Sequence, residues 1–207
     1  MNTLYVRYCT TAVLLSCLSF GALAQTADPK FEAMLKEGFR AEGIAGLDRL
    51  EQDTIQALCS DPEVRQTHAA QKALIEEQSK AMAAIKPPTD GKYLGSWKAG
   101  EAVAQSGRGA TWSDTTKAPN GGGCYNCHQI SKQEISHGNI GPSLTGYGKT
   151  RGTSEAILTY TWNRINNSKA YNACSNMPRM SHFNLLTEQQ IKDVMALLLD
   201  PESPVNK

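Results

Sequence analysis

The sequence carries almost no net charge and contains no cluster of basic residues. Its 207 residues include 21 Lys and Arg against 20 Asp and Glu, for a formal charge of +1. Proteins that bind nucleic acid usually present a basic patch to the phosphate backbone, so we expect no nucleic-acid partner. Hydrophobic residues make up 40% of the chain and charged residues 20%. This balance excludes a disordered charged tail and predicts a packed globular protein.

The sequence also lacks a hydrophobic run long enough to span a membrane. The apolar stretch at residues 11–20 is shorter than the roughly 20 residues that a spanning helix requires, and no second such stretch exists. Arg7 precedes this stretch and the small residues of Ala22-Leu23-Ala24 follow it. Because this order is typical of a secretory signal peptide, we predict cleavage after Ala24. The mature chain is then expected in the periplasm, with no membrane partner.

The same stretch contains a second, weaker signal. Leu14-Leu15-Ser16-Cys17 resembles a lipoprotein signal, which would leave a lipid on Cys17. The apolar residues continue past this cysteine to Ala24, and their continuation favours cleavage after Ala24. That cleavage removes residues 1–24, and four cysteines remain in the mature chain: Cys59, Cys124, Cys127 and Cys174.

Cys59 and Cys174 lie outside the Cys-x-x-Cys sequence that the other two cysteines form. An exported protein meets an oxidising environment, in which each thiol needs a partner or a reason to stay free. A disulfide between Cys59 and Cys174 is the simplest assignment. A buried thiol and a bond to another chain are the alternatives.

Residues 25–92 are predicted to form a helical N-terminal extension, because they are rich in Glu, Gln, Lys and Ala and show no strand-like alternation. Hydrophobic spacing predicts one helix over residues 44–58, and Asp61-Pro62 predicts the start of another. Pro87-Pro88 cannot continue that helix and marks the end of the extension. A second module, residues 93–207, follows it.

The second module is predicted to contain short helices joined by long loops, so the expected fold class is all-α. Helices are expected over residues 97–105 and from Thr153 or Ser154 to about residue 167. The last helix begins at Thr187-Glu188-Gln189-Gln190, which has the form of a capping box. Long loops in so small a domain indicate that something other than side chains fills part of the core.

Cys124-Tyr125-Asn126-Cys127-His128 has the form of a c-type haem attachment sequence. Two thiols at this spacing can each bond to one vinyl group of a porphyrin, and His128 is then placed to ligate the iron. A redox pair and half of a zinc site are the competing interpretations. Cys174 and His182 do not supply the second ligand pair that a zinc site requires. We therefore expect one covalently attached haem c, with its iron.

An iron bound to His128 needs a sixth ligand or an open face. Met177 stands directly before Pro178, which favours an extended backbone from which a side chain can project into a haem pocket. Met180 is the nearest rival, and Cys174, His137 and His182 are weaker candidates. Met195 lies on the apolar face of the last helix and is predicted to be core. The carbonyl of Pro142, in Gly141-Pro142-Ser143-Leu144, is a candidate acceptor for the second ring N–H of the ligating histidine.

These motifs together resemble the class I cytochrome c pattern across the whole second module. More closely, residues 137–148 and 197–206 resemble the SoxX family, the monohaem cytochrome subunits of bacterial thiosulfate-oxidising systems. The match covers about residues 95–206. Residues 28–92 resemble the N-terminal extension of one SoxX subtype.

The resemblance implies a periplasmic complex rather than an isolated carrier. SoxX pairs with SoxA, a second c-type cytochrome on which thiosulfate is joined to a cysteine of the carrier protein SoxYZ. The expected partners are therefore a SoxA-like cytochrome, transiently a SoxYZ-like carrier, and a downstream electron acceptor. No residue of this chain is expected to be catalytic, so it would be the electron-transfer subunit of a heterodimeric L-cysteine S-thiosulfotransferase. A free-standing electron shuttle and a haem sensor or peroxidase are the alternatives.

The surface expected to meet the partner is the haem edge at Cys124 and Cys127 with the loops beside it, flanked by the loop from Met177 to Phe183. Tyr125 stands between the attachment cysteines, and aromatic side chains are enriched in interface cores. We therefore expect Tyr125 to contribute to this contact. The alternative is that Tyr125 only covers the haem. The near-zero net charge predicts that affinity depends little on salt.

Overall fold

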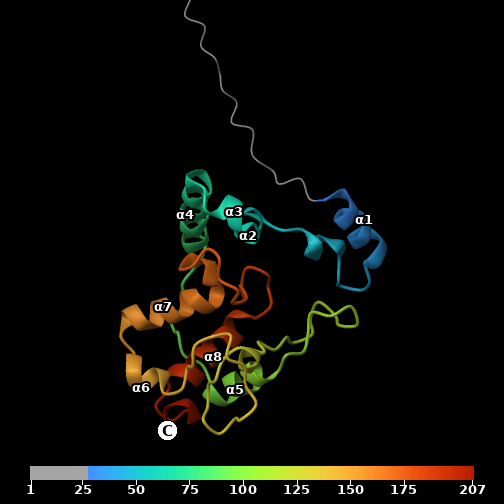
Figure 1. Ribbon diagram of the computed structural model, residues 1–207. Coiled ribbons are helices and arrows are strands. Elements are labelled where there is room, and N and C mark those ends of the chain that lie inside the picture. The colour runs from blue at the N-terminus through green and yellow to red at the C-terminus, as the bar shows by residue number, and fades with distance from the viewer. Residues whose placement is uncertain (1–27) are drawn as a thin grey trace, which may run out of the picture.

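The computed structural model describes residues 28–207, and these residues form helices joined by long loops (Figure 1). The only β-type pairing among them is an isolated bridge between Glu42 and Ala45, so the predicted all-α fold class is confirmed. In chain order the elements are α1 (Pro29–Gly38), η1 (Leu47–Leu50), α2 (Thr54–Ser60), α3 (Pro62–Arg65), α4 (His68–Ala83), α5 (Trp97–Gln105), η2 (Cys124–Asn126), α6 (Tyr147–Arg151), α7 (Glu155–Asn166), η3 (Ser168–Ala170), α8 (Glu188–Leu199) and η4 (Pro204–Asn206). None of the helices within residues 28–207 has the length and apolarity needed to cross a membrane. The predicted signal peptide and Cys17 lie outside the described residues.

Helices α5 and α8 cross at the centre of the second module. Gly100 of α5 lies against the backbone of α8, where an added Cβ would come within 2.0 Å of the carbonyl oxygen of Asp193. Only glycine permits so close a crossing. Met195 of α8 is fully buried in the surrounding core, which confirms its predicted place. The capping box at Thr187 is formed as predicted, with Gln190 as its second member.

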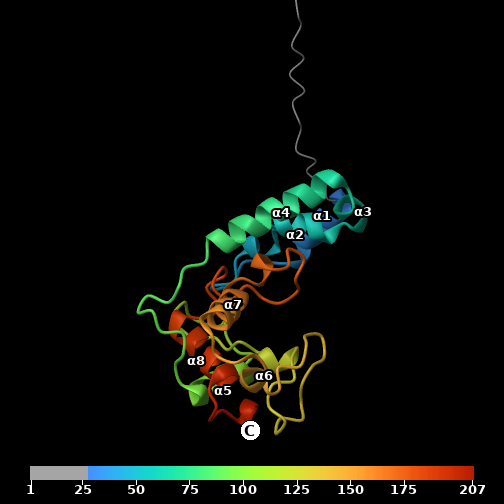
Figure 2. The ribbon, with the colours of Figure 1, turned by 90° about the vertical axis from the view of Figure 1, so that its left-hand side faces the viewer.

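The extension occupies one end of the molecule, and α5, α6, α8 and the C-terminus lie at the other (Figures 1 and 2). Its own core is small: Ile55 and Leu74 are buried with Ala173, which belongs to the loop after η3. The predicted disulfide is present beside this cluster, with the Cα atoms of Cys59 and Cys174 5.4 Å apart. The extension is therefore covalently joined to the second module.

The predicted helix over residues 44–58 is wrong in its first half. Gly43 has a φ of +55° and lies so close to the loop after α5 that an added Cβ would meet the carbonyl oxygen of Trp112 at 1.9 Å. Arg49 donates a hydrogen bond of 2.6 Å to the carbonyl oxygen of Ala110 in the same loop. These tertiary contacts favour a turn and the short η1 over a continuous helix, and α2 begins only at Thr54.

The segment that joins α4 to α5 is fixed to the second module. Trp162 of α7 donates its indole N–H to the carbonyl oxygen of Lys86 at 2.9 Å. Lys192 of α8 pairs with Asp90 at 2.6 Å and with Glu188 at 3.0 Å. This segment thus holds the extension against α7 and α8 rather than acting as a free linker.

Candidate haem site

His128 follows η2, and its ring packs against the loop formed by residues 138–144. Its Nδ1 lies 2.7 Å from the carbonyl oxygen of Pro142, as the sequence predicted. A carbonyl can only accept, so Nδ1 carries the hydrogen of the neutral ring. The lone pair of Nε2 is then left for a metal.

Gly141 holds this loop close to the His128 ring. An added Cβ would lie 2.2 Å from Cε1 of His128, so no other residue fits without moving the ring. The N–H of Gly141 donates to the carbonyl oxygen of Cys127 at 2.8 Å, and the N–H of Gly138 donates to that of Tyr125 at 2.8 Å. The loop and the Cys-x-x-Cys-His sequence therefore form one braced unit.

The thiols of Cys124 and Cys127 are free, although the other two cysteines of the described chain are bonded to each other. Burial raises the pKa of the Cys124 thiol to about 11. Redox-active Cys-x-x-Cys pairs instead lower the pKa of one thiol, because the thiolate is the reactive form. Within residues 28–207, no group of three or more His, Cys, Asp and Glu side chains could hold a metal ion. Both competing interpretations, redox pair and zinc site, lack support here.

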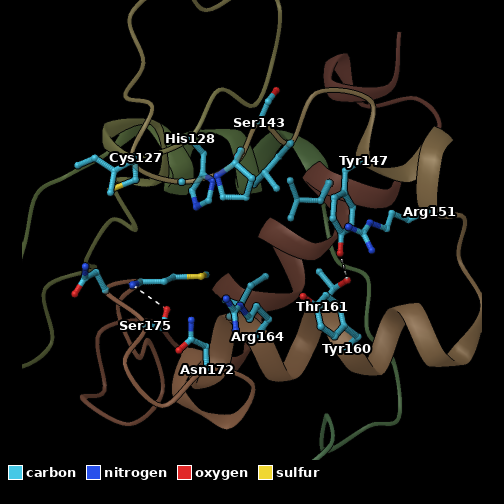
Figure 3. A pocket seen from close by; sticks show the side chains of 18 of the residues that line it. Cys127, His128, Ser143, Tyr147, Arg151, Tyr160, Thr161, Arg164, Asn172 and Ser175 are labelled. Carbon is cyan, nitrogen blue, oxygen red and sulfur yellow. Dashed lines mark hydrogen bonds between the residues drawn. The ribbon is translucent and has the colours of Figure 1, made fainter. Parts of the chain in front are cut away.

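A cavity of about 530 Å³ opens beside His128 (Figure 3). One wall carries His128, Ser143 and Tyr147, and the opposite wall carries Thr161 and other residues of α7 together with the loop after η3. Cofactor sites span about 300–1,000 Å³, so the volume suits a large planar group. Its lining includes Cys127, Leu144, Ile165 and Met177. The attachment sequence and the preferred sixth-ligand candidate thus share one cavity.

Comparison with known proteins agrees with this geometry. Residues 108–200 match the family model described as cytochrome c. The chain is also 38% identical over 158 residues, 75% of its own length and 73% of the relative's, to a protein of Aquifex aeolicus (strain VF5) named "Uncharacterized lipoprotein". Residues 108–200 therefore form a cytochrome c domain. Such a domain implies a covalently bound haem c and haem-based electron transfer, and together with the lipoprotein name of the relative it indicates a protein outside the cytoplasm.

The residues of this cytochrome fit a haem c. The free thiol of Cys127 lines the cavity, and His128 presents a free Nε2 to it. The free thiol of Cys124 lies three residues earlier and packs against the hydrophobic core. Apolar side chains line the space next to His128. Sulfur and imidazole are the donors that haem attachment and ligation use. His128 would hold the iron, and Cys124 and Cys127 would carry the porphyrin.

Met177 and Met180 occupy different environments. Met177 lines the cavity, its N–H donates to Ser175 Oγ at 3.2 Å, and its carbonyl oxygen accepts from Ser168 Oγ at 2.5 Å. Met180 is buried in the hydrophobic core and does not line the cavity. Cys174 forms the disulfide with Cys59, so its sulfur has no thiol group with which to ligate iron. The geometry therefore favours Met177 as the sixth ligand, which stays a prediction.

The expectation that Tyr125 lies at the partner surface is wrong. Its side chain is only 5% exposed, and its hydroxyl donates to Glu101 at 3.1 Å and accepts from the N–H of Ser131 at 3.3 Å. Burial and the neighbouring carboxylate of Glu101 raise the pKa of this tyrosine. Tyr125 therefore braces the attachment sequence against α5 and is not available to a partner.

Several polar residues of the cavity were not found from the sequence. Arg151 and Arg164 both line it, and Arg164 is fixed by a hydrogen bond of 3.1 Å to the carbonyl oxygen of Ser168. The hydroxyls of Tyr147 and Thr161 meet at 2.8 Å across the cavity wall (Figure 3). Cations here suit the carboxylates that a haem carries. No motif marks these residues, because they reach the cavity through the packing of α6 and α7.

Proposed function

We propose that this cytochrome is the electron-accepting subunit of a periplasmic sulfur-oxidising complex. In this complex, a SoxA-like cytochrome would join thiosulfate to a cysteine of a SoxYZ-like carrier, and one haem c bound to Cys124 and Cys127 of this chain would receive the electrons. The observation that carries the proposal is the resemblance of residues 137–148 and 197–206 to SoxX. The alternative is a free-standing periplasmic electron shuttle.

The two segments that carry the resemblance touch each other in the fold. The N–H of Gly146 donates to the carbonyl oxygen of Val205 at 2.8 Å. Gly148 lies so close to residues 197–206 that an added Cβ would come within 2.8 Å of Nδ2 of Asn206. Asn206 also donates to the carbonyl oxygen of Leu198 at 3.1 Å. The two segments therefore form one structural unit, and this supports treating the two stretches of SoxX resemblance as one feature.

The site supports electron transfer without catalysis. Pro142 fixes the tautomer of His128, and Met177 lines the same cavity. Haem c would supply one-electron chemistry, and a thioether ligand favours its reduced state. Among the described residues, Cys59 and Cys174 form the disulfide, and Cys124 and Cys127 would be used to attach the haem. The proposal therefore assigns the bond-forming chemistry to the partner.

The partner surface is reassigned from Tyr125 to the loop that follows the attachment sequence. Ile135 is 90% exposed and Ile140 is 78% exposed, and Ile140 also lines the haem cavity. Solvent-exposed apolar side chains near a redox centre are suited to a stable contact with a second cytochrome. We expect the contact to depend little on salt, because the whole chain has a formal charge of only +1.

The deciding experiment is purification of the cytochrome from its native periplasm, with intact-mass and haem analysis of what remains bound. A 1:1 complex with a second c-type cytochrome, reduced by thiosulfate only when the carrier is added, is the expected result. Recovery of this chain alone, with no second cytochrome at any salt concentration, would favour the free shuttle. A methionine-to-iron absorption band in the oxidised protein would reject a sensor or peroxidase with an open distal face.

A pair of surface variants tests the contact itself. Ile135→Asp is expected to weaken the complex while leaving the haem spectrum unchanged. Ile75→Asp is the matched control, because Ile75 is also exposed but lies on α4 of the extension. Equal affinity of both variants for the partner would remove the loop from the interface.

The way in which the chain leaves the cytoplasm has two candidate forms. Cleavage after Ala24 gives a soluble periplasmic protein, and processing before Cys17 leaves a lipid on that residue. The first is the form predicted from the sequence, and the name of the Aquifex relative supports the second. The intact mass of the exported protein separates them, since only the second form retains residues 17–24 and carries acyl chains.

A further inference from the structure

A second cavity, of about 550 Å³, lies where the extension meets the second module. Gln56 and Cys59 of α2 line it from one side, and Pro178 and Phe183 line it from the other. The residues from Cys174 to Met177 line both this cavity and the haem cavity. One stretch of loop therefore separates the two spaces.

This second cavity is strongly cationic. Arg65, Lys169 and Arg179 line it, and no Asp or Glu is among the described residues that do so. Lys169 is only 7% exposed and Arg179 only 4% exposed. Asp53 neutralises one of these charges through an ion pair of 2.6 Å with Nη1 of Arg179. The cavity is left with an excess of buried positive charge, which is costly without a counterion.

The hydrogen-bonding capacity of these cations is also incompletely used. Arg179 stacks on the Phe183 ring at 4.5 Å, and its buried Nη2 has no acceptor among the described residues. Lys169 donates one hydrogen bond of 2.9 Å, to the carbonyl oxygen of Ala173. Burial and the charge of Arg179 lower the pKa of Lys169, and the carboxylate of Asp53 opposes them only in part. A buried donor without an acceptor costs about 1–3 kcal/mol.

We propose that this cavity binds a small inorganic oxyanion of the sulfate class, held by Arg65, Lys169 and Arg179. A tetrahedral dianion offers several acceptor atoms in a compact volume, which matches two guanidinium groups and an ammonium group that line one cavity from different elements. Sulfate, thiosulfate and phosphate share this chemistry. The inference rests on the cavity alone and does not require the cytochrome to belong to a sulfur-oxidising complex.

Binding at this site also affects the redox state. A dianion beside the Met177 loop favours the oxidised, more positive haem, so the reduction potential falls when the anion binds. By linkage, the oxidised cytochrome binds the anion more tightly than the reduced one by the same factor. This coupling gives a second readout that is independent of any partner.

The test is calorimetric titration of the purified holoprotein with sodium sulfate, thiosulfate and phosphate, against sodium chloride at matched ionic strength. Lys169→Gln and Arg65→Gln each remove one proposed ligand. Lys72→Gln is the control, because Lys72 is an exposed cation of the extension that does not line the cavity. The reduction potential of the holoprotein in each salt provides the second readout, and thermal unfolding in the same salts provides a third.

Saturable binding of at least one dianion, weakened about tenfold or more by Lys169→Gln and by Arg65→Gln but unchanged by Lys72→Gln, is the expected result. The preferred anion then identifies the source of the ligand. If Lys169→Gln does not fold, Arg65→Gln decides, since Arg65 is only partly buried. Heats and melting temperatures that follow ionic strength alone, or that change equally in all three variants, would overturn the proposal.

Discussion

Removal of the Cys59–Cys174 disulfide has a calculable effect on stability. The bond joins residues 115 apart in the sequence. In the chain-entropy model, a closed loop of that length stabilises the folded state by about 5 kcal/mol, because the cross-link restricts the unfolded chain. Cys59→Ser combined with Cys174→Ser should lower the free energy of unfolding by about that amount. A typical domain has only about 5–15 kcal/mol in total, so the change is large.

The folded structure itself should survive the double substitution. Ile55 and Leu74 still pack against Ala173, and the ion pair between Asp53 and Arg179 still joins the extension to the loop before α8. The residues that line the haem cavity belong to the second module, and Cys174 is the one among them that the double variant replaces with a side chain of similar size. We therefore expect an unchanged haem spectrum and helix content in the absence of denaturant, with the effect confined to the unfolding equilibrium.

Guanidinium chloride unfolding, followed by both circular dichroism and haem absorbance, measures this difference. The double variant should unfold at a lower denaturant concentration, and the wild-type protein in a thiol reductant should behave in the same way. Ser60→Ala is a useful control, since it changes an exposed neighbour of Cys59 without touching the bond. A loss below about 1 kcal/mol would refute the chain-entropy reasoning. A helix content already reduced without denaturant would show instead that the bond holds the extension in its folded state.

Three further outcomes are expected. Met177→Ala should abolish the methionine-to-iron band, whereas Met180→Ala should keep it and destabilise the core by about 2–5 kcal/mol; retention of the band in Met177→Ala would assign the ligand to another residue. Although burial alone would raise it, the pKa of Asp53 is lowered by the N–H of Gln56 and by Arg179, so its stabilising contribution is full above about pH 4 and is lost as the pH falls. The free energy of unfolding, measured by denaturation between pH 7 and pH 3, should therefore fall less steeply for Asp53→Asn, which keeps the cap of α2, than for the wild type. The same pH dependence in both proteins would contradict the assignment. Gly141→Ala should reduce the haem bound per chain, measured as pyridine haemochrome, because the new Cβ would lie 2.2 Å from Cε1 of His128; normal loading with an unshifted spectrum would show that the ring can move aside.

The parts of the fold that follow from local signals were predictable. Ser154 precedes α7, Thr187 caps α8, and Pro142 accepts from His128, and each assignment needs only a few neighbouring residues. The disulfide followed from export and from the number of cysteines that the attachment sequence leaves over. In each case, few residues other than the predicted partner could have made the interaction.

The features that depend on distant contacts were not predictable. Tyr125 is buried because Glu101 of α5 accepts its hydroxyl. Residues 44–50 leave the helical path because Gly43 packs on Trp112. Arg65 and Arg179 face one cavity because the disulfide and the ion pair between Asp53 and Arg179 hold α2 and its neighbours at the loop before α8. Hydrophobic periodicity reports which face of an element is buried, but it does not report what that face meets.

The extension acts on the loop that carries Met177. Cys174, on one side of Met177, is bonded to α2, and Arg179, on the other, is paired with Asp53 at the start of α2. Ser168 holds the carbonyl oxygen of Met177 itself. A loop fixed on both sides would keep Met177 in place as an iron ligand, which is the preorganisation that such a site requires. The N-terminal helices therefore hold the Met177 loop from outside the second module, and an anion bound beneath the same loop would act on it from the same side.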